Sequence, residues 1–342
     1  MMQFDPKKAQ PDATRSPIAP IQLGPEPLER NLILAPMAGV TNLPFRLIAA
    51  QSGAALVFTE TVSAKGLVHG GAKSWRLVES APREDPLAYQ LFGGEVEPLG
   101  AATAMLADRG ARFIDLNLGC PVKKFLKHGA GSCLMRDPPK IAPLVAAMRR
   151  ALPHGALSVK MRLGWDQQTL TAPEVARIAE AEGADFVSVH GRTRAQQYRG
   201  RANLDGIAEV VASVRIPVFA NGDITTPTEA LHALERTRAA GVMIGRGAMN
   251  QPWIFSQIVE LAGGSRVHAP DGAARAALVE KHIDLMLRFF PDPRSTVHML
   301  KKYLCAYASG IVGASEFRNR INRADDLDSV VEDAMDFFRA AT

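Results

Sequence analysis

The sequence is poor in cysteine and contains no long uninterrupted hydrophobic run. Its 342 residues include three cysteines, Cys120, Cys133 and Cys305, without CxxC spacing or paired histidines nearby. This pattern argues against a disulfide framework and against a zinc site, so we expect no bound metal. No apolar run has the length of a membrane span, and residues 1–17 carry charges and prolines where a signal peptide has an apolar core. We therefore expect a cytoplasmic protein that does not enter a membrane.

The sequence also lacks an internal repeat of about 20–50 residues, which argues against a solenoid. Hydrophobic residues make up 47% of the chain and charged residues 22%, a composition typical of a globular protein. The formal net charge of +5 permits a polyanionic partner but does not predict one, since many proteins that bind no nucleic acid are equally basic. We expect a monomer.

From residue 31 onward, short apolar runs alternate with amphipathic stretches. Eight runs are typical of parallel strands: LILAP, ALVFTE, PLAYQLFG, RFIDLNLG, LSVKMRLG, DFVSVHG, IPVFANG and GVMIGRG. The stretches between them predict helices, among them 42–52, 98–109, 138–151, 173–183, 203–214 and 227–239. Gly53, Gly110 and Gly183 stand where three of these helices should end. Eight strand–helix units predict an α/β fold of the TIM (β/α)8 barrel type.

The pattern divides the chain into three parts. Residues 1–17 are expected to be a flexible N-terminal tail, and the barrel is expected over 18–255, beginning with an irregular segment or short hairpin. Residues 256–342 lack strand-like runs and predict a small all-helical C-terminal domain. From 294 to 323 this domain has six basic residues against a single acid, Glu316. Such a stretch is compatible with a nucleic-acid-binding face and with an ordinary solvated helix surface.

Polar residues interrupt nearly every expected strand near its C-terminal end, where TIM barrels carry their active sites. They are Gln90, Asp115, Asn117, Lys160, Arg162, His190, Asn221 and Asp223. Lys160 and Arg162 are two residues apart, so they should point to the same side of their strand. Two cations at a barrel mouth predict an anionic or electron-rich ligand. The structural alternative is a network in which both pair with Asp115 or Asp223.

Glycine-rich segments follow the last two expected strands. NGD (221–223) and GRGAMN (245–250) lie where TIM barrels commonly bind phosphate against backbone. Gly245 and Gly247 would let the backbone approach a ligand closely, and Arg246 would add charge-assisted hydrogen bonds. This arrangement predicts a phosphorylated cofactor.

Cys120 lies in the loop NLGCPVKK after the fourth expected strand. A cysteine is most often a small buried apolar residue, but Gly119 and Pro121 here fix a loop at the barrel mouth. An ordinary thiol has a pKa of about 8.5, so it is mostly protonated at neutral pH and can serve as a general acid.

Seven segments of the barrel resemble, in order and spacing, the signature segments of the tRNA-dihydrouridine synthases. They are LAPMAGVTNLPFR (34–46), QLFG (90–93), DLNLGCPVKK (115–124), KMRLGWD (160–166), HGRTRAQQYRG (190–200), ANGDI (220–224) and MIGRGAMNQPWIF (243–255). The C-terminal segment EFRNRINRA (316–324) is similar to the bacterial B subgroup in particular. Gly247 stands where alanine is common in the family, and we expect this difference to have little effect.

The resemblance implies an FMN-binding barrel followed by a helical tRNA-recognition domain. It places the backbone of Pro36, Met37 and Ala38 against the edge of the isoalloxazine ring, and Gln90 and Lys160 on its polar rim. The residues that it implies for the ribityl chain and phosphate are His190, Asn221, Gly222, Asp223, Gly245 and Arg246.

The resemblance also implies the substrate and the chemistry. A uridine of the tRNA D-loop would be flipped out of the tRNA to face Asn117 and Arg162. Basic residues would hold the phosphate backbone, with Lys123, Lys124, Arg192, Arg194, Arg199 and the 294–323 cluster as candidates. NADPH or NADH would reduce FMN, hydride would pass to uracil C6, and Cys120 would protonate C5 from the opposite face.

Two other functions remain open at this point. An FMN-dependent reductase of a free pyrimidine, similar to dihydroorotate dehydrogenase, would share the chemistry but would need no helical RNA-binding domain. A non-catalytic tRNA-binding protein on the same barrel would have no use for Cys120, Lys160, His190 and Arg246 together.

Overall fold

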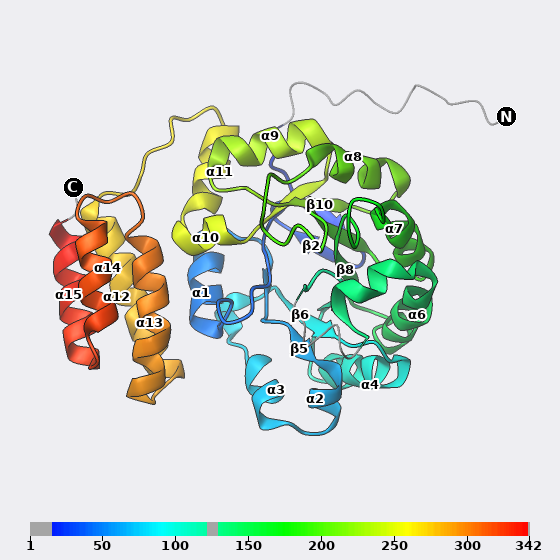
Figure 1. The fold of residues 1–342 in the computed structure, drawn as a ribbon, viewed down its shortest axis with the longest axis horizontal. Coiled ribbons are helices and arrows are strands. Elements are labelled where there is room, and N and C mark those ends of the chain that lie inside the picture. The colour runs from blue at the N-terminus through cyan, green and yellow to red at the C-terminus, as the bar shows by residue number, and fades with distance from the viewer. Residues whose placement is uncertain (1–15, 122–128, 341–342) are drawn as a thin grey trace.

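The computed structural model describes residues 16–121 and 129–340, which form a barrel and a helical bundle beside it (Figure 1). Eight parallel strands make the barrel: β3 Leu32–Leu34, β4 Val57–Phe58, β6 Leu87–Phe92, β7 Phe113–Asn117, β8 Ala156–Arg162, β9 Phe186–His190, β10 Val218–Asn221 and β11 Gly241–Ile244. They pair in the order β3-β11-β10-β9-β8-β7-β6-β4. The backbone N–H of Leu34 donates to Leu56 at 2.9 Å, which joins β3 to the start of β4. The predicted TIM barrel and its eight strands are confirmed.

Helices surround the barrel at the positions that the sequence predicts. They are α1 Leu43–Gln51, α4 Val96–Ala107, α6 Ala142–Ala151, α7 Ala172–Ala181, α8 Leu204–Ser213 and α9 Pro227–Thr237. Gly53, Gly110 and Gly183 follow three of these helices with φ of 104°, 89° and 92°, a backbone conformation that favours glycine. Several shorter elements were not expected: β5 Val62–Ser63, α2 Ala64–Val68, α3 Ala72–Leu77 and the 3-10 turns Pro82–Glu84 and Gly131–Arg136. The 3-10 turn Pro138–Ile141 begins the segment expected as helix 138–151, and the short helix α10 Arg246–Asn250 follows β11.

Alternation along the strands sorts the barrel interior into layers. At the N-terminal ends of the strands lies an apolar cluster that includes Phe113, Ala156, Phe186 and Phe219. A hairpin of β1 Ile21–Leu23 and β2 Glu26–Leu28 packs Leu23 and Leu28 into this cluster and closes that end. Two residues further along, the inward positions are buried and polar, namely Gln90, Asp115, Ser158 and Ser188. The next inward positions reach the open end of the barrel and are Asn117, Lys160, His190 and Asn221.

The C-terminal part is helical, as the sequence predicts. Its helices are α11 Ile254–Ala262, α12 Gly272–Phe289, α13 Pro293–Tyr307, α14 Ala314–Arg323 and α15 Leu327–Ala340. The expected boundary at residue 255 falls within α11, whose Ile254, Phe255 and Ile258 are buried and which packs against α9 of the barrel. We therefore propose that the barrel ends after α11 and that the bundle begins with α12.

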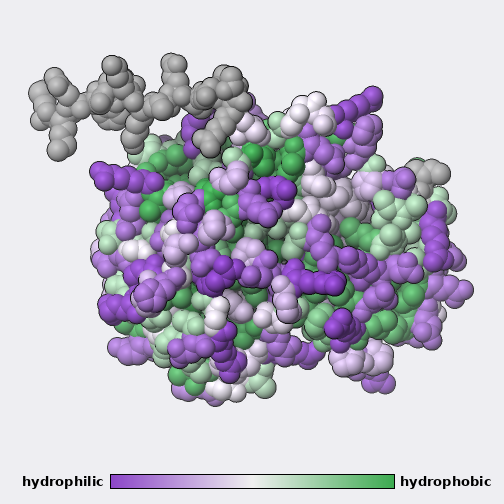
Figure 2. All heavy atoms as spheres, turned by 180° about the vertical axis from the view of Figure 1, so that it is seen from behind, coloured by the Kyte–Doolittle hydropathy of each residue, from purple (hydrophilic) through white to green (hydrophobic). Residues whose placement is uncertain are grey.

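The surface of the molecule is of mixed polarity. Figure 2 shows hydrophilic residues spread over one whole face, with hydrophobic residues in separate patches. Within residues 16–121 and 129–340, the helices are too short or too polar to cross a membrane.

Candidate active site

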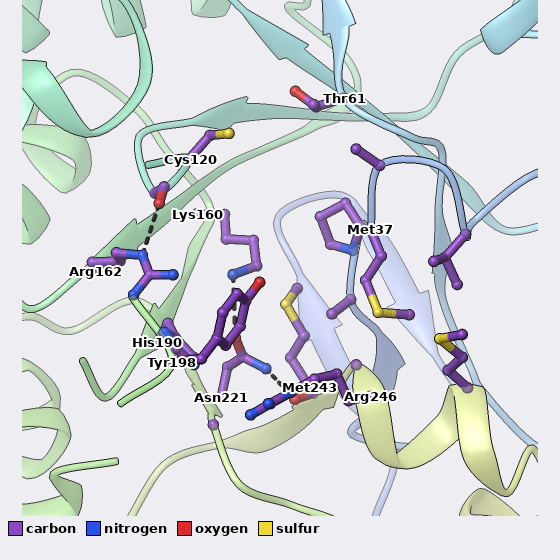
Figure 3. Close-up of a pocket in the computed structure, with 18 of the residues that line it drawn as sticks. Met37, Thr61, Cys120, Lys160, Arg162, His190, Tyr198, Asn221, Met243 and Arg246 are labelled. Atoms are coloured by element: carbon purple, nitrogen blue, oxygen red, sulfur yellow. Dashed lines mark hydrogen bonds between the residues drawn. The ribbon is translucent and has the colours of Figure 1, made fainter. Parts of the chain in front are cut away.

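A cavity of about 460 Å³ lies at the C-terminal ends of the barrel strands. It is lined by every residue expected at the cofactor, the uracil or the acid: Pro36, Met37, Ala38, Gln90, Asn117, Cys120, Lys160, Arg162, His190, Asn221, Gly222, Asp223, Gly245 and Arg246. In Figure 3, Cys120 and Arg162 lie on one side of the cavity and Met37 on the other. The structure therefore brings the expected residues together from strand ends and loops that are far apart in the sequence.

Lys160 and Arg162 lie on β8 without carboxylate partners among the described residues. Lys160 Nζ donates to Asn221 Oδ1 at 3.2 Å. Arg162 donates to three backbone carbonyls, including that of Gly119 at 2.8 Å. No ion pair within 4.0 Å in the described part of the chain involves either cation. The structural alternative, in which both pair with Asp115 or Asp223, is therefore wrong, and both charges are left to face the cavity.

Burial perturbs the pKa values of these groups. Burial lowers the pKa of Lys160 to about 8, the charge of Arg162 lowers it as well, and the charge of Asp115 opposes the change. Burial also lowers the pKa of Arg162 and, together with the charge of Lys160, takes the pKa of His190 well below its ordinary value. An anionic ligand would reverse these effects, because it favours the charged form of each group.

A chain of buried hydrogen bonds connects Asp115 to the Cys120 loop. Gln90 Nε2 donates to Asp115 Oδ2 at 2.7 Å, and Asn117 Nδ2 donates to Gln90 Oε1 at 2.7 Å. Asn117 Oδ1 accepts the backbone N–H groups of Gly119 and Cys120 at 3.0 and 2.9 Å. Each side-chain amide donates through its nitrogen and accepts through its oxygen, so the chain of hydrogen bonds fixes the orientation of Gln90 and Asn117. The start of the loop that carries Cys120 is thus held from inside the barrel.

The loops after β9, β10 and β11 approach one another closely where a phosphate was expected. Gly222 has a φ of 123°, and a Cβ there would lie 2.9 Å from Ala202. A Cβ on Gly247 would lie 2.3 Å from the carbonyl oxygen of Ile224. Alanine at position 247 would therefore push the loops after β10 and β11 apart in this protein, whereas glycine lets them pack closely. Arg246 lies at this end of the cavity, 3.3 Å from Asp223.

Among the residues expected to hold the tRNA phosphate backbone, the structure describes Arg192 and Arg194. Arg192 is 2% exposed and donates to Asp223 and to the carbonyl of Gly200, both at 2.6 Å. Its Nη2 is thus used inside the protein, whereas its Nη1 is buried without a hydrogen-bond partner among the described residues; its contact with tRNA stays a prediction. Arg194 is half-buried and lies over the Trp165 ring at 4.4 Å. Lys123 and Lys124 lie outside the described residues.

Tyr198 is a cavity residue that sequence reasoning missed. It is 59% exposed, and its ring lies 4.6 Å from the Arg246 guanidinium and 5.7 Å from that of Arg162. Figure 3 shows the ring lying across the cavity between these two cations. Its place in the motif HGRTRAQQYRG was the available signal, but an exposed tyrosine in a loop gives no indication of where its ring points. Thr61, also missed, lines the opposite part of the cavity.

Metal ligands were not expected, and the described residues contain no group of three or more His, Cys, Asp or Glu side chains placed to hold an ion. The three cysteines form no disulfide. His190 Nδ1 is buried without a hydrogen-bond partner among the described residues. A buried polar atom at a cavity wall commonly marks the place of a ligand or water.

Comparison with known proteins finds relatives that match nearly the whole chain. The family model described as "Dihydrouridine synthase (Dus)" matches residues 33–342. The chain is 39% identical to "Probable tRNA-dihydrouridine synthase" of Rickettsia bellii, over 93% of this chain and 98% of the relative. It is 38% identical to "tRNA-dihydrouridine synthase B" of Xanthomonas axonopodis pv. citri, over 94% of this chain and 96% of the relative.

Two solved structures share the barrel fold at low sequence identity. An old yellow enzyme homologue from Zymomonas mobilis aligns with a TM-score of 0.55 and 11% identity, over 74% of this chain and 94% of that one. Morphinone reductase aligns with a TM-score of 0.52 and 12% identity, over 75% and 93%. At these identities the likeness concerns the fold alone. The family model and the relatives, which span nearly the whole chain, show that this protein belongs to the dihydrouridine synthase family.

Proposed function

We propose that this chain is a tRNA-dihydrouridine synthase that uses FMN and NADPH or NADH to reduce the C5–C6 bond of uridines in the tRNA D-loop. Family membership and the names of the relatives support the reaction and the tRNA substrate. The observation that carries the proposal is the position of Cys120 in one cavity with Lys160 and Arg162, two cations without carboxylate partners. The site thus combines a proton donor with an electropositive wall.

The described residues fit a phosphorylated flavin. Gly222, Asp223, Gly245 and Arg246 would hold the phosphate, where two loops meet without Cβ atoms between them. His190 would use its buried Nδ1 or its other ring nitrogen toward the ribityl chain, with Asn221 beside it. Pro36, Met37 and Ala38 would lie along the ring, with Gln90 and Lys160 at its polar rim. FMN, when bound and reduced by the nicotinamide, supplies hydride chemistry.

The chain's own residues would orient the uracil and deliver a proton. Asn117 and Arg162 would bind the uracil, and the cation of Lys160 would stabilise negative charge that develops in the site. The Cys120 thiol would keep its proton until that proton is transferred to uracil C5. The hydrogen bond from the Cys120 backbone N–H to Asn117 would hold the cysteine in place. The uridine must be flipped out of the tRNA to reach this cavity.

Replacing Cys120 with alanine tests the assignment of the acid. The Cys120→Ala protein should bind FMN and oxidise NADPH as the wild type does, while dihydrouridine formation in unmodified tRNA falls by roughly 10²–10⁴-fold. Cys133→Ala is the matched control, because Cys133 Sγ contacts the carbonyl of Ala130 at 3.2 Å and does not line the cavity. Dihydrouridine formation at the wild-type rate in Cys120→Ala would refute the role of Cys120.

The same enzyme preparation distinguishes the substrate classes. Mass spectrometry should detect dihydrouridine in a D-loop uridine of tRNA, and no reduction of free uracil, uridine or orotate at equal concentration. Turnover of a free pyrimidine in place of tRNA would instead favour the reductase alternative. A purified wild-type protein without flavin absorbance, and unable to take up FMN, would contradict catalysis of either kind.

A further inference from the structure

The turn between β3 and α1 forms one wall of the cavity. The backbone N–H groups of Val40 and Thr41 both donate to the carbonyl of Met37 at 3.0 Å, and the Met37 N–H donates to Thr41 Oγ1 at 3.1 Å. Met37 and Val40 line the cavity, together with Ala38 between them. The conformation of this turn, residues 37–41, therefore sets the shape of that wall.

Two side chains of α13 hold the outer side of the turn. Lys302 Nζ donates to the carbonyl of Gly39 at 2.6 Å, and Tyr303 Oη donates to the carbonyl of Val40. From the barrel, Glu60 accepts the backbone N–H of Gly39. Gly39 has a φ of 71°, which favours glycine. The turn is thus held between an acid of the barrel and two residues of the helical bundle.

Aromatic packing fixes Tyr303 in this position. Its ring stacks on Phe45 of α1 with centroids 5.4 Å apart, and the ring of His282 of α12 lies 4.5 Å away. Figure 1 shows α1 between the bundle and the barrel. Tyr303 is 1% exposed, so its hydroxyl is already ordered where it meets the turn. Preorganisation of this kind lowers the entropy that a ligand loses when it binds.

We propose that Lys302 and Tyr303 are positioning residues for the cofactor, so that α13 completes the flavin site of the barrel by fixing the 37–41 turn. The inference rests on the proposed function, because it takes the cavity to be the FMN site. It gives the helical bundle, expected to recognise tRNA, a second role in holding the flavin. Lys302 belongs to the basic 294–323 stretch that was expected to contact tRNA, yet its ammonium group donates a hydrogen bond to the turn.

Paired substitutions of neighbouring residues test the inference. Tyr303→Phe removes the hydroxyl that bonds the turn, whereas Tyr307→Phe removes a buried hydroxyl that bonds His282 at 2.9 Å. Lys302→Met and Lys301→Met each remove one charge from α13, but Lys301 Nζ bonds the carbonyl of Asn322 on α14 at 3.3 Å. The two substitutions in each pair remove the same chemical group, but only one of the two residues contacts the 37–41 turn.

The measurement is the dissociation constant of FMN from the full-length apoprotein, by flavin fluorescence, together with the melting temperature of each protein. We expect FMN to bind roughly three- to tenfold more weakly to Tyr303→Phe and about two- to threefold more weakly to Lys302→Met. Tyr307→Phe and Lys301→Met should bind FMN as the wild type does. Both tyrosine variants should lower the melting temperature, since each loses a buried hydrogen bond.

Three results would overturn the inference, and they are distinguishable. Unchanged FMN affinity in Tyr303→Phe and Lys302→Met would show that α13 does not position the turn. Equal weakening in Tyr303→Phe and Tyr307→Phe would show a general effect of stability. A wild-type apoprotein that binds no FMN would overturn the proposed function itself, and this inference with it.

Discussion

Replacing Asp115 with asparagine should make the protein more stable at neutral pH and less active. The Asp115 carboxyl is buried, and burial raises its pKa from 3.8 to about 6, although hydrogen bonds from Ser158 and Gln90 and the charge of Lys160 oppose the rise. The unfolded chain therefore releases this proton at a lower pH than the folded chain does. The contribution of Asp115 to the free energy of unfolding is therefore greatest below pH 3.8, where the group is protonated in both states. It falls as the pH rises from 3.8 toward 6 and stays low above pH 6.

The two pKa values set the size of the effect. Relative to low pH, the raised pKa of Asp115 lowers the free energy of unfolding by about 1.5 kcal/mol at pH 5 and about 3 kcal/mol at pH 7. An asparagine has nearly the same shape, and it can accept from Gln90 through its oxygen and donate to Ser158 through its nitrogen. Asp115→Asn should therefore exceed the wild type in stability by these amounts, and its advantage should grow between pH 5 and pH 7.

Urea unfolding of the apoprotein at pH 5, 6, 7 and 8 measures the difference. Ser158→Ala is the matched control, because it keeps the carboxyl and removes the hydroxyl that bonds it at 2.6 Å, so it should destabilise at pH 7. An Asp115→Asn protein no more stable than the wild type at pH 7, or with a difference independent of pH, would refute the reasoning.

Activity should change in the opposite direction to stability. The charge of Asp115 raises the pKa of Lys160, so its loss should move deprotonation of Lys160 to lower pH. Dihydrouridine formation by Asp115→Asn should then decline at a lower alkaline pH than in the wild type. A gain in stability joined to a loss of activity is the pattern expected where a site retains a destabilising charge for its function.

Two further substitutions test the packing around the site. Glu84→Gln removes the charge partner of Arg46, a buried guanidinium 2.7 Å from it, and should lower the free energy of unfolding by about 3–5 kcal/mol in urea titrations; a loss below 1 kcal/mol would contradict a buried ion pair. Gly247→Ala places a Cβ 2.3 Å from the Ile224 carbonyl and should weaken FMN binding roughly tenfold by fluorescence titration. Gly263→Ala, with no atom closer than 3.4 Å, is its control, and equal affinities would show that the loops tolerate the methyl group.

The barrel could be predicted because short segments of the sequence are enough to indicate each of its strands and helices. Each strand is a short apolar run, and three of the helices, α1, α4 and α7, end near a glycine that adopts positive φ. The two-residue alternation also predicted that Lys160 and Arg162 share a side, and the closure of the barrel then brought them to Cys120. The short helices α2 and α3 could not be predicted, since five or six residues are too few to show a helical period.

The partners of individual side chains could not be predicted, because they depend on contacts between distant residues. Arg192 follows a strand end, as a substrate-binding cation would, yet its guanidinium turns inward to Asp223, which is 31 positions away. Tyr198 is exposed but lies between two cations of the cavity. The link from Lys302 to Gly39 joins residues 263 positions apart, and no motif indicates it.

The charges of the cavity explain why its resident ligand should be an anion. The carboxylate of Asp223 is shared by Arg192 and Arg246, so it does not neutralise Lys160 or Arg162. Arg162 is buried and Lys160 is half-buried, and the charge of Arg162 lowers the pKa of Lys160. Negative charge on a ligand beside Lys160 and Arg162 would raise both pKa values, so its binding would stabilise the folded protein. The same burial that destabilises the cations alone makes their attraction to an anion stronger than it would be in water.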